Sequence, residues 1–232
     1  MPLSQGDAVA CTPEQANYLR NVLRLAAGDT VLLFNGHDGE WRAEVAEAGK
    51  RAVRLRPEAQ VRPQQAGPDI DYLFAPLKRS RLDYMVQKAT ELGARRLRPV
   101  LTRYTTPERV NSQRMRANAV EAAEQCGILA VPEVLEPDKL ARVLAGWEAS
   151  RRLIFCDEGA ELASPIVALQ ALPKGPLAVL IGPEGGFSPE EREDLIAQPF
   201  VTRISLGPRI MRADTAAVAA MALVNAVLGD WR

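Results

Sequence analysis

The chain has 232 residues, of which 47% are hydrophobic and 25% charged, and its formal net charge is zero. This composition is that of a globular protein with one or two domains and a substantial buried core. The three cysteines are scattered and no apolar run is long enough to span a membrane, which excludes a disulfide-rich module and a membrane-spanning chain. We therefore expect a cytoplasmic protein with no membrane partner and no metal site.

Charge is distributed unevenly between the two halves of the chain. Residues 1–116 contain 19 basic and 13 acidic residues, whereas residues 117–232 contain 10 and 16. Arginine makes up 24 of the 29 basic residues, and its guanidinium binds phosphate and stacks on bases. The pattern favours a nucleic-acid surface on the first half, with a solvated basic face as the alternative. The single histidine, His37, nearly excludes serine–histidine catalysis and histidine-rich metal sites.

Residues 1–60 are predicted to form one helix and several short strands. A helix beginning at Thr12-Pro13 and ending near Gly28 would place Arg20 and Arg24 four residues apart, within reach of one ligand or on a solvated face. Apolar and polar residues then alternate in short segments joined by turn residues, which predicts a small β-barrel. The expected strands are 31–34, 41–45 and 52–56.

The segment 61–69 holds two prolines and a glycine and is the expected linker, so we place one domain at 1–66 and the other at 70–232. Beyond it, strand and helix patterns alternate, which predicts an α/β domain with a mainly parallel sheet and helices on both faces. Expected strands are 71–75, 96–101, 153–156, 177–181 and 201–206; expected helices are 80–92, 108–126, 162–171, one from 189, and 214–228. The last helix is apolar almost all round, so we expect its own domain and a second subunit to cover it.

The stretch 177–191, LAVLIGPEGGFSPEE, predicts a strand, a glycine loop and a helix start. Ser188 and Glu191 have the spacing of a capping box around a proline at the first helical position. The loop fits neither the dinucleotide nor the phosphate-loop pattern, and Glu184 would repel a polyphosphate. Such a loop lies at the carboxyl edge of a parallel sheet, where open α/β folds bind ligands; a purely structural turn is the alternative.

Two loops together resemble a known family. IGPEGGFSPEE at 181–191 and SLGPRIMRADTA at 205–216 are similar to the signature pair of the RsmE family, bacterial methyltransferases of the SPOUT (trefoil-knot) superfamily. LDYMVQKATELGARRLRPVLTRY at 82–104 and VEAAEQCG at 120–127 resemble that family's other blocks, and YLRNVLRLAAGDTVLLFNG at 18–36 resembles its PUA-like RNA-binding barrel. The resemblance covers essentially the whole chain.

The resemblance implies a knotted SPOUT domain at 70–232 beside a PUA-like barrel at 1–66. It also implies a homodimer that binds S-adenosyl-L-methionine and methylates N3 of a uridine in 16S rRNA of the small ribosomal subunit. The alternatives are another SPOUT activity, such as ribose 2′-O methylation, and a non-catalytic RNA-binding protein with structural loops.

The resemblance implies that the two glycine loops line the cofactor cleft, and their backbone groups can approach a ligand without side-chain obstruction. Apolar side chains from both loops would form the adenine slot. The expected cofactor-binding residues are Ile181, Gly182, Pro183, Glu184, Gly185, Gly186, Leu206, Gly207, Ile210, Met211, Arg212 and Thr215.

Methylation at N3 of uridine removes a weakly acidic proton, so an arginine beside the base would stabilise the developing negative charge. Arg212 is the first candidate, with Arg209 and Arg103 behind it. Glu184 is a candidate for a bond to the cofactor, and Glu184, Asp214 or solvent for the general base. The expected RNA-binding residues are Arg20, Arg24, Lys78, Arg79, Arg81 and Arg103.

The chain departs from the family pattern at three places. Asn17-Tyr18 stands where histidine is common, Ile128-Leu129 where an arginine is usual, and Asp214 where the family has glutamate. These departures bear on RNA contacts and on the position of the substrate more than on cofactor binding.

Overall fold

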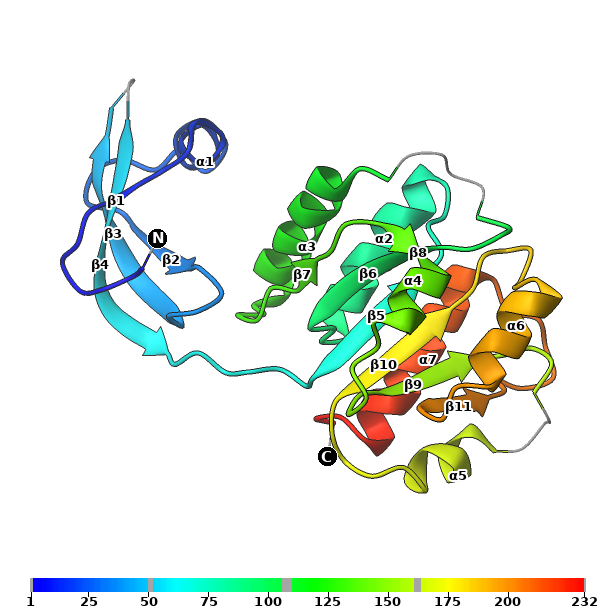
Figure 1. Cartoon of the computed structure of the whole chain (residues 1–232). Coiled ribbons are helices and arrows are strands. Elements are labelled where there is room, and N and C mark those ends of the chain that lie inside the picture. The colour runs from blue at the N-terminus through cyan, green and yellow to red at the C-terminus, as the bar shows by residue number, and fades with distance from the viewer. Residues whose placement is uncertain (1, 50–51, 106–109, 161–163, 232) are drawn as a thin grey trace. The chain divides into compact units, whose positions relative to one another are not determined.

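The chain changes from an antiparallel to a parallel sheet near residue 66. The structure, a computed structural model, describes residues 2–49, 52–105, 110–160 and 164–231. It divides into two compact units, Met1–Ala66 and Gly67–Arg232 (Figure 1). Within the described ranges, no helix is both long and apolar enough to cross a membrane.

The first unit is built on a four-stranded antiparallel sheet. Its order is β1-β4-β3-β2, and side chains that alternate along β3 and β4 form its core, as the period-two pattern predicted. The core residues are Ala43, Val45, Val53 and Leu55. The strands are β1 (Val9–Ala10), β2 (Thr30–Phe34), β3 (Glu40–Ala48) and β4 (Val53–Arg62).

The helix expected from Thr12 to Gly28 begins as predicted, but it changes character after Asn17 and ends before Gly28. A capping box at Thr12 starts α1 (Pro13–Asn17), but the chain continues as the π-helical turn η1 (Tyr18–Val22). A π turn closes i→i+5 hydrogen bonds and rotates the following side chains away from α-helical positions. Arg24 lies beyond η1 with a φ of 58°, and the Arg20 guanidinium donates to the carbonyl of Gly49 at 3.1 Å. The two arginines therefore do not share a helix face.

The second unit holds a parallel sheet of seven strands. The order is β11-β9-β10-β5-β6-β7, and β8 also pairs in parallel with β6. β10 is central and buried along its whole length, between β9 and β5. The strands are β5 (Ile70–Phe74), β6 (Arg96–Leu101), β7 (Glu133–Val134), β8 (Asp138–Lys139), β9 (Arg152–Cys156), β10 (Leu177–Ile181) and β11 (Val201–Ile204).

Helices cover both faces of this sheet, as the alternation predicted. Alternate residues of β5 and β10 point to opposite faces, so that Tyr72 and Val179 join one core and Leu73 and Leu180 the other. The first core is closed by α2 (Arg79–Glu91), α3 (Ser112–Cys126), α5 (Pro165–Gln170) and α7 (Ala213–Val227). The second is closed by α4 (Leu140–Ala145) and α6 (Pro189–Ile196), which lie in front of the sheet in Figure 1.

Several expected bounds differ from those found. The helix expected over 108–126 begins at Ser112, because Asn111 caps it by accepting from the amide of Arg114 at 3.0 Å. It ends as predicted at Gly127, whose φ of 62° breaks the helix. Positions 108–109 of that range, and 162–163 of the helix expected at 162–171, lie outside the described residues. The sequence pattern missed β7, β8 and α4, which are too short to show a period.

A buried ionic cluster joins the amino ends of four strands. The Arg151 guanidinium, just before β9, donates to Asp69 and to the carbonyl of Leu177, both at 2.9 Å. It also lies 3.6 Å from Asp71, which accepts from Arg96 at 2.7 Å. Because Arg151 and Asp71 are almost wholly buried, removing one partner would leave a desolvated charge. The cluster fixes the register of this edge of the sheet.

Candidate active site

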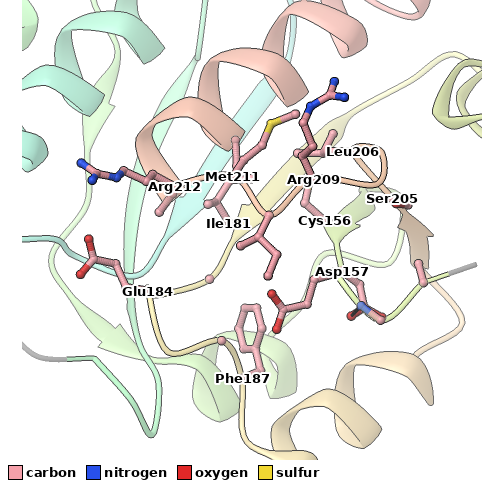
Figure 2. A pocket seen from close by; sticks show the side chains of 18 of the residues that line it. Cys156, Asp157, Ile181, Glu184, Phe187, Ser205, Leu206, Arg209, Met211 and Arg212 are labelled. Carbon is pink, nitrogen blue, oxygen red and sulfur yellow. Dashed lines mark hydrogen bonds between the residues drawn. The ribbon is translucent and has the colours of Figure 1, made fainter. Parts of the chain in front are cut away.

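A cavity of about 680 Å³ lies at the opposite, carboxyl edge of the sheet. Its walls are the three loops that follow β9, β10 and β11, together with the start of α7. In the view of Figure 2, Glu184 and Arg212 lie at one side of the cavity and Ser205 at the other. Its size is that of a typical small-molecule site.

The loop after β10 needs its glycines for packing and for backbone geometry. A Cβ on Gly182 would lie 2.5 Å from the ring of Phe187, which packs edge-on against Phe155 with 5.1 Å between ring centres. Gly186 has a φ of 71°, and its amide donates to the carbonyl of Pro183 at 2.9 Å. The loop is therefore folded tightly onto the phenylalanine that forms one cavity wall.

The predicted capping box then starts α6. The amide of Glu191 donates to the hydroxyl of Ser188 at 3.2 Å, and the Glu191 carboxylate accepts from the Ser188 amide at 3.0 Å. Two amides at the start of the helix are thus satisfied within the loop itself.

The loop after β11 turns at Gly207 and leads into α7. Gly207 has a φ of 105°, and its amide donates to the hydroxyl of Ser205 at 3.3 Å. Arg212 is the N-cap residue of α7 and its side chain is exposed. Ile210, which we expected in the adenine slot, lines the cavity but is 91% exposed. The enclosed apolar wall comes instead from Ile181, which is 3% exposed, with Leu206, Met211 and Phe187 half-buried.

The loop after β9 forms the third wall, which sequence reasoning missed. Asp157 is 4% exposed and accepts from Arg192 at 3.1 Å and from Arg203 at 2.8 Å. Both guanidiniums also donate to the carbonyl of Gly159, so the loop is clamped to α6 and β11. Burial alone would raise the pKa of Asp157, but the hydrogen bonds from Arg192, the Gly159 amide and Arg203 outweigh it and hold that pKa below its usual range.

The neighbouring thiol, that of Cys156, is protonated at neutral pH. Burial of Cys156 at the end of β9 raises the pKa of its thiol to about 12, so the side chain is neutral at pH 7. It therefore contributes an apolar surface to the cavity.

Replacing Asp157 with asparagine is expected to lower the free energy of unfolding by about 1–3 kcal/mol at pH 7, because the buried carboxylate that accepts from Arg192 and Arg203 loses its charge. Since the folded-state pKa is lowered, the carboxylate stabilises the fold above its unfolded pKa of about 3.9, and this stabilisation is lost as the pH falls through the folded pKa. Urea denaturation of both proteins between pH 7 and pH 3 measures the difference.

The matched control is Asp138→Asn, which removes an exposed ion pair with Arg142 and should change stability by less than about 1 kcal/mol. A difference between wild type and Asp157→Asn that grows as the pH falls below 4 would contradict the assignment.

Most of the predicted cofactor-binding and catalytic residues are brought together at this cavity. Gly185 and Thr215 lie outside the described residues that line it. A Cβ on Gly185 would lie 3.3 Å from Cβ of Tyr104, so this glycine faces a neighbouring loop. The predicted residues that do line the cavity are Ile181, Gly182, Pro183, Glu184, Gly186, Leu206, Gly207, Arg209, Ile210, Met211 and Arg212.

The two candidate carboxylate bases are engaged elsewhere. Glu184 forms an ion pair with Arg81 of α2. Asp214, in the first turn of α7, accepts from the amide of Thr215 at 3.0 Å and is outside the described cavity lining. The ion pair links a predicted RNA-binding residue to the glycine loop after β10, a contact that no local pattern could reveal.

Four of the six predicted RNA-binding residues share the edge of the sheet that carries the cavity. Lys78 and Arg79 lie at the start of α2, directly after β5, and Arg81 follows one turn later. Arg103 follows β6. All four are outside the sheet core, with Arg81 half-buried by its partner Glu184 and the others exposed. Arg20 and Arg24 belong to the first unit.

The missed wall had a signal in the sequence. Asp157-Glu158-Gly159 follows a strand of a parallel sheet directly, in the position where the two glycine loops follow theirs. The position of this segment directly after a parallel strand was therefore the feature that could have predicted a cavity wall, although the segment itself matches no motif. The other missed lining residues are Cys156, Ala160, Phe187, Arg192, Ser205, Pro208, Ala213 and Ala216.

The all-parallel sheet and its loop-lined cavity define an α/β protein of the kind that binds a small ligand at the carboxyl ends of its strands. A family model described as an RNA methyltransferase domain matches residues 64–225. A second model, described as an RNA methyltransferase PUA domain, matches residues 12–58. The chain belongs to the RNA methyltransferase family.

Two relatives that align with most of the chain share one name. The chain is 30% identical to ribosomal RNA small subunit methyltransferase E of Rickettsia conorii, over 90% of this chain and 85% of that protein. It is 31% identical to the protein of that name from Synechocystis, over 95% of this chain and 73% of the relative.

The fold is shared with a methyltransferase from Legionella pneumophila whose structure contains bound S-adenosylmethionine. That chain superimposes with a TM-score of 0.85 at 27% identity, covering 99% of this chain and 96% of its own. The small subunit methyltransferase E of Neisseria gonorrhoeae superimposes with the same TM-score at 23% identity, covering 100% and 97%. The predicted class, a SPOUT-type α/β domain beside a smaller PUA domain, is confirmed.

Proposed function

We propose that this protein transfers a methyl group from S-adenosyl-L-methionine to N3 of a uridine in 16S rRNA of the small ribosomal subunit, in the cytoplasm. The observation that carries the proposal is the cavity between two glycine loops at the carboxyl edge of the sheet, in a chain of the RNA methyltransferase family. A relative with the same fold has S-adenosylmethionine bound.

The residues of the cavity suit such a cofactor. The backbone of the two glycine loops lines the cavity and can approach an adenosine and a methionine moiety closely, although the amides of Gly186 and Gly207 are bonded within the loops. Ile181, Leu206 and Met211 supply apolar surface for a purine. Glu158 is an exposed carboxylate of the lining and suits a cationic sulfonium, whereas Asp157 is already paired with Arg192 and Arg203.

The cofactor supplies an electrophilic methyl group on sulfur, and the chain must position the uracil and accommodate the charge that develops when N3 loses its proton. Arg212, at the N-cap of α7 and on the cavity wall, is placed to bind a uracil carbonyl oxygen. Arg209 lines the same wall. Because Glu184 is paired with Arg81, we assign it to holding the cofactor loop and assign removal of the proton to solvent.

The two units would have different functions, RNA binding and catalysis. We assign residues 1–66 to a PUA-like RNA-binding domain and residues 70–232 to the catalytic domain, supported by the separate family matches. Phosphate contacts are assigned to Arg20 and Arg24 on the first and to Lys78, Arg79, Arg81 and Arg103 on the second.

A knot and a homodimer complete the proposal. β11 lies beyond β9 at one end of the sheet, yet α7 packs on α2 and on central β10. The segment from Ser205 to Arg212 must therefore run back past the loops after β9 and β10, which supports a threaded connection.

One stripe of α7 stays partly exposed although its residues are small or apolar, which supports a subunit interface. These residues are Thr215, Val218, Ala219, Ala222 and Ala226.

Saturating S-adenosylmethionine is expected to raise the melting temperature, because a ligand at a hundredfold excess over its Kd stabilises the folded state by about 2.7 kcal/mol. Small ribosomal subunits from cells that lack this protein should then accept a radiolabelled methyl group. Digestion to nucleosides and mass spectrometry locate that group.

A methyl group on the uracil base supports the proposal, and one on the ribose identifies a 2′-O methyltransferase. If S-adenosylmethionine does not raise the melting temperature and no methyl group is transferred, the result identifies a non-catalytic RNA-binding protein.

A further inference from the structure

The loop after β6 forms a compact turn at the same edge of the sheet as the cavity. The amide of Thr105 donates to the carbonyl of Thr102 at 3.2 Å, and the amide of Thr102 donates to the Thr105 hydroxyl at 2.9 Å. The two threonine hydroxyls are also 2.9 Å apart. This closed set of bonds leaves Arg103 and Tyr104 at the tip of the turn.

The turn is attached to the cofactor loop at two points. The amide of Arg103 donates to the carboxylate of Glu191 at 2.7 Å, and the same carboxylate caps α6 by accepting from Ser188. Tyr104 lies against Gly185, where a Cβ would be 3.3 Å from Cβ of the tyrosine. The tyrosine backbone is therefore fixed beside the loop that borders the cavity, although its side chain lies outside the described lining.

Packing alone does not account for this tyrosine. Tyr104 is 47% exposed, and it lies between the exposed Arg103 and the Gly185 loop, whose neighbour Glu184 pairs with Arg81. A half-exposed aromatic ring on a fixed turn, with guanidiniums near it, is the arrangement that holds an unstacked nucleobase and its phosphates. N3 of a uridine in a base pair is blocked, so the RNA must present bases out of their stack to this edge.

We propose that Tyr104 is a stacking platform for an unpaired base of the RNA substrate, next to the methyl-donor cavity, and that it positions the RNA for the reaction. The inference rests on the proposed RNA methyltransferase function. The ring face supplies the binding energy, and the contact with Gly185 supplies the orientation.

The test compares Tyr104→Leu with Tyr104→Phe. Leucine keeps an apolar contact with Gly185 but has no aromatic face, whereas phenylalanine keeps the face and loses only the hydroxyl. Tyr104→Leu is expected to weaken binding to small ribosomal subunits lacking the modification, and to lower kcat/KM for them, by about 5- to 100-fold. Tyr104→Phe should stay close to wild type. The Kd for S-adenosylmethionine, measured by calorimetry, should be unchanged in both.

Tyr84→Leu is the matched control, since Tyr84 is also an exposed tyrosine of this unit and lies on α2 with Lys88 over its ring. It should bind RNA as wild type does. If Tyr104→Leu binds and methylates RNA as well as wild type, or weakens S-adenosylmethionine binding as much as RNA binding, the stacking assignment is wrong. Absence of methyl transfer by the wild-type protein would instead overturn the proposed function, so the two failures are distinct.

Discussion

Arg212→Ala is expected to lower the rate of methyl transfer by about 10²- to 10³-fold, the loss typical of removing one donor that stabilises developing negative charge. Arg212 is exposed at the N-cap of α7, and its side chain makes no capping hydrogen bond there, so the fold should not depend on it. Single-turnover methyl transfer with saturating S-adenosylmethionine measures the effect, and calorimetry should give an unchanged Kd for the cofactor.

Arg142→Ala is the control, because Arg142 is a 74%-exposed arginine of the same unit on α4. It should leave the rate unchanged. If Arg212→Ala turned over at the wild-type rate, the charge at N3 would have to be stabilised by another group, with Arg209 the next to be replaced.

Gly182→Ala is expected to weaken S-adenosylmethionine binding by about tenfold or more, which corresponds to at least about 1.4 kcal/mol. The added methyl would lie 2.5 Å from the Phe187 ring, so the ring must leave its edge-on contact with Phe155 and the cavity wall must move. Overpacking of this kind should also cost about 1–3 kcal/mol of folding free energy. Calorimetric titration and urea denaturation measure the two effects.

Gly146→Ala provides the comparison, since a methyl there would be 3.7 Å from the nearest atom, the carbonyl oxygen of Arg142, and φ is −100°. Both its stability and its cofactor affinity should match wild type. Equal affinity in Gly182→Ala would show that Phe187 is not part of the binding surface.

Features that depend on neighbouring residues were predicted well from the sequence. Ser188 and Glu191 form the expected capping box, Gly127 ends its helix, and the alternation from residue 70 gives a parallel sheet with two covered faces. Capping side chains, the left-handed conformation of glycine and the spacing of apolar residues decide these features within a few turns of chain.

Features that depend on distant residues could not be predicted. The Glu191 carboxylate also accepts from the amide of Arg103, which is 88 positions away. The sequence suggested a bond from Glu184 to the cofactor, whereas in the fold Glu184 forms an ion pair with Arg81. In each case the deciding partner comes from tertiary packing.

The buried ion pairs around Arg151 hold the amino ends of the strands together, whereas the loops that line the cavity follow the carboxyl ends of strands in the same sheet. The residues that stabilise strand register and the residues that would bind a ligand thus lie at opposite ends of one sheet. A substitution in a loop need not disturb strand register, because the far end holds it. Substitutions in the loops can therefore alter which substrate is bound while the fold of the sheet is kept.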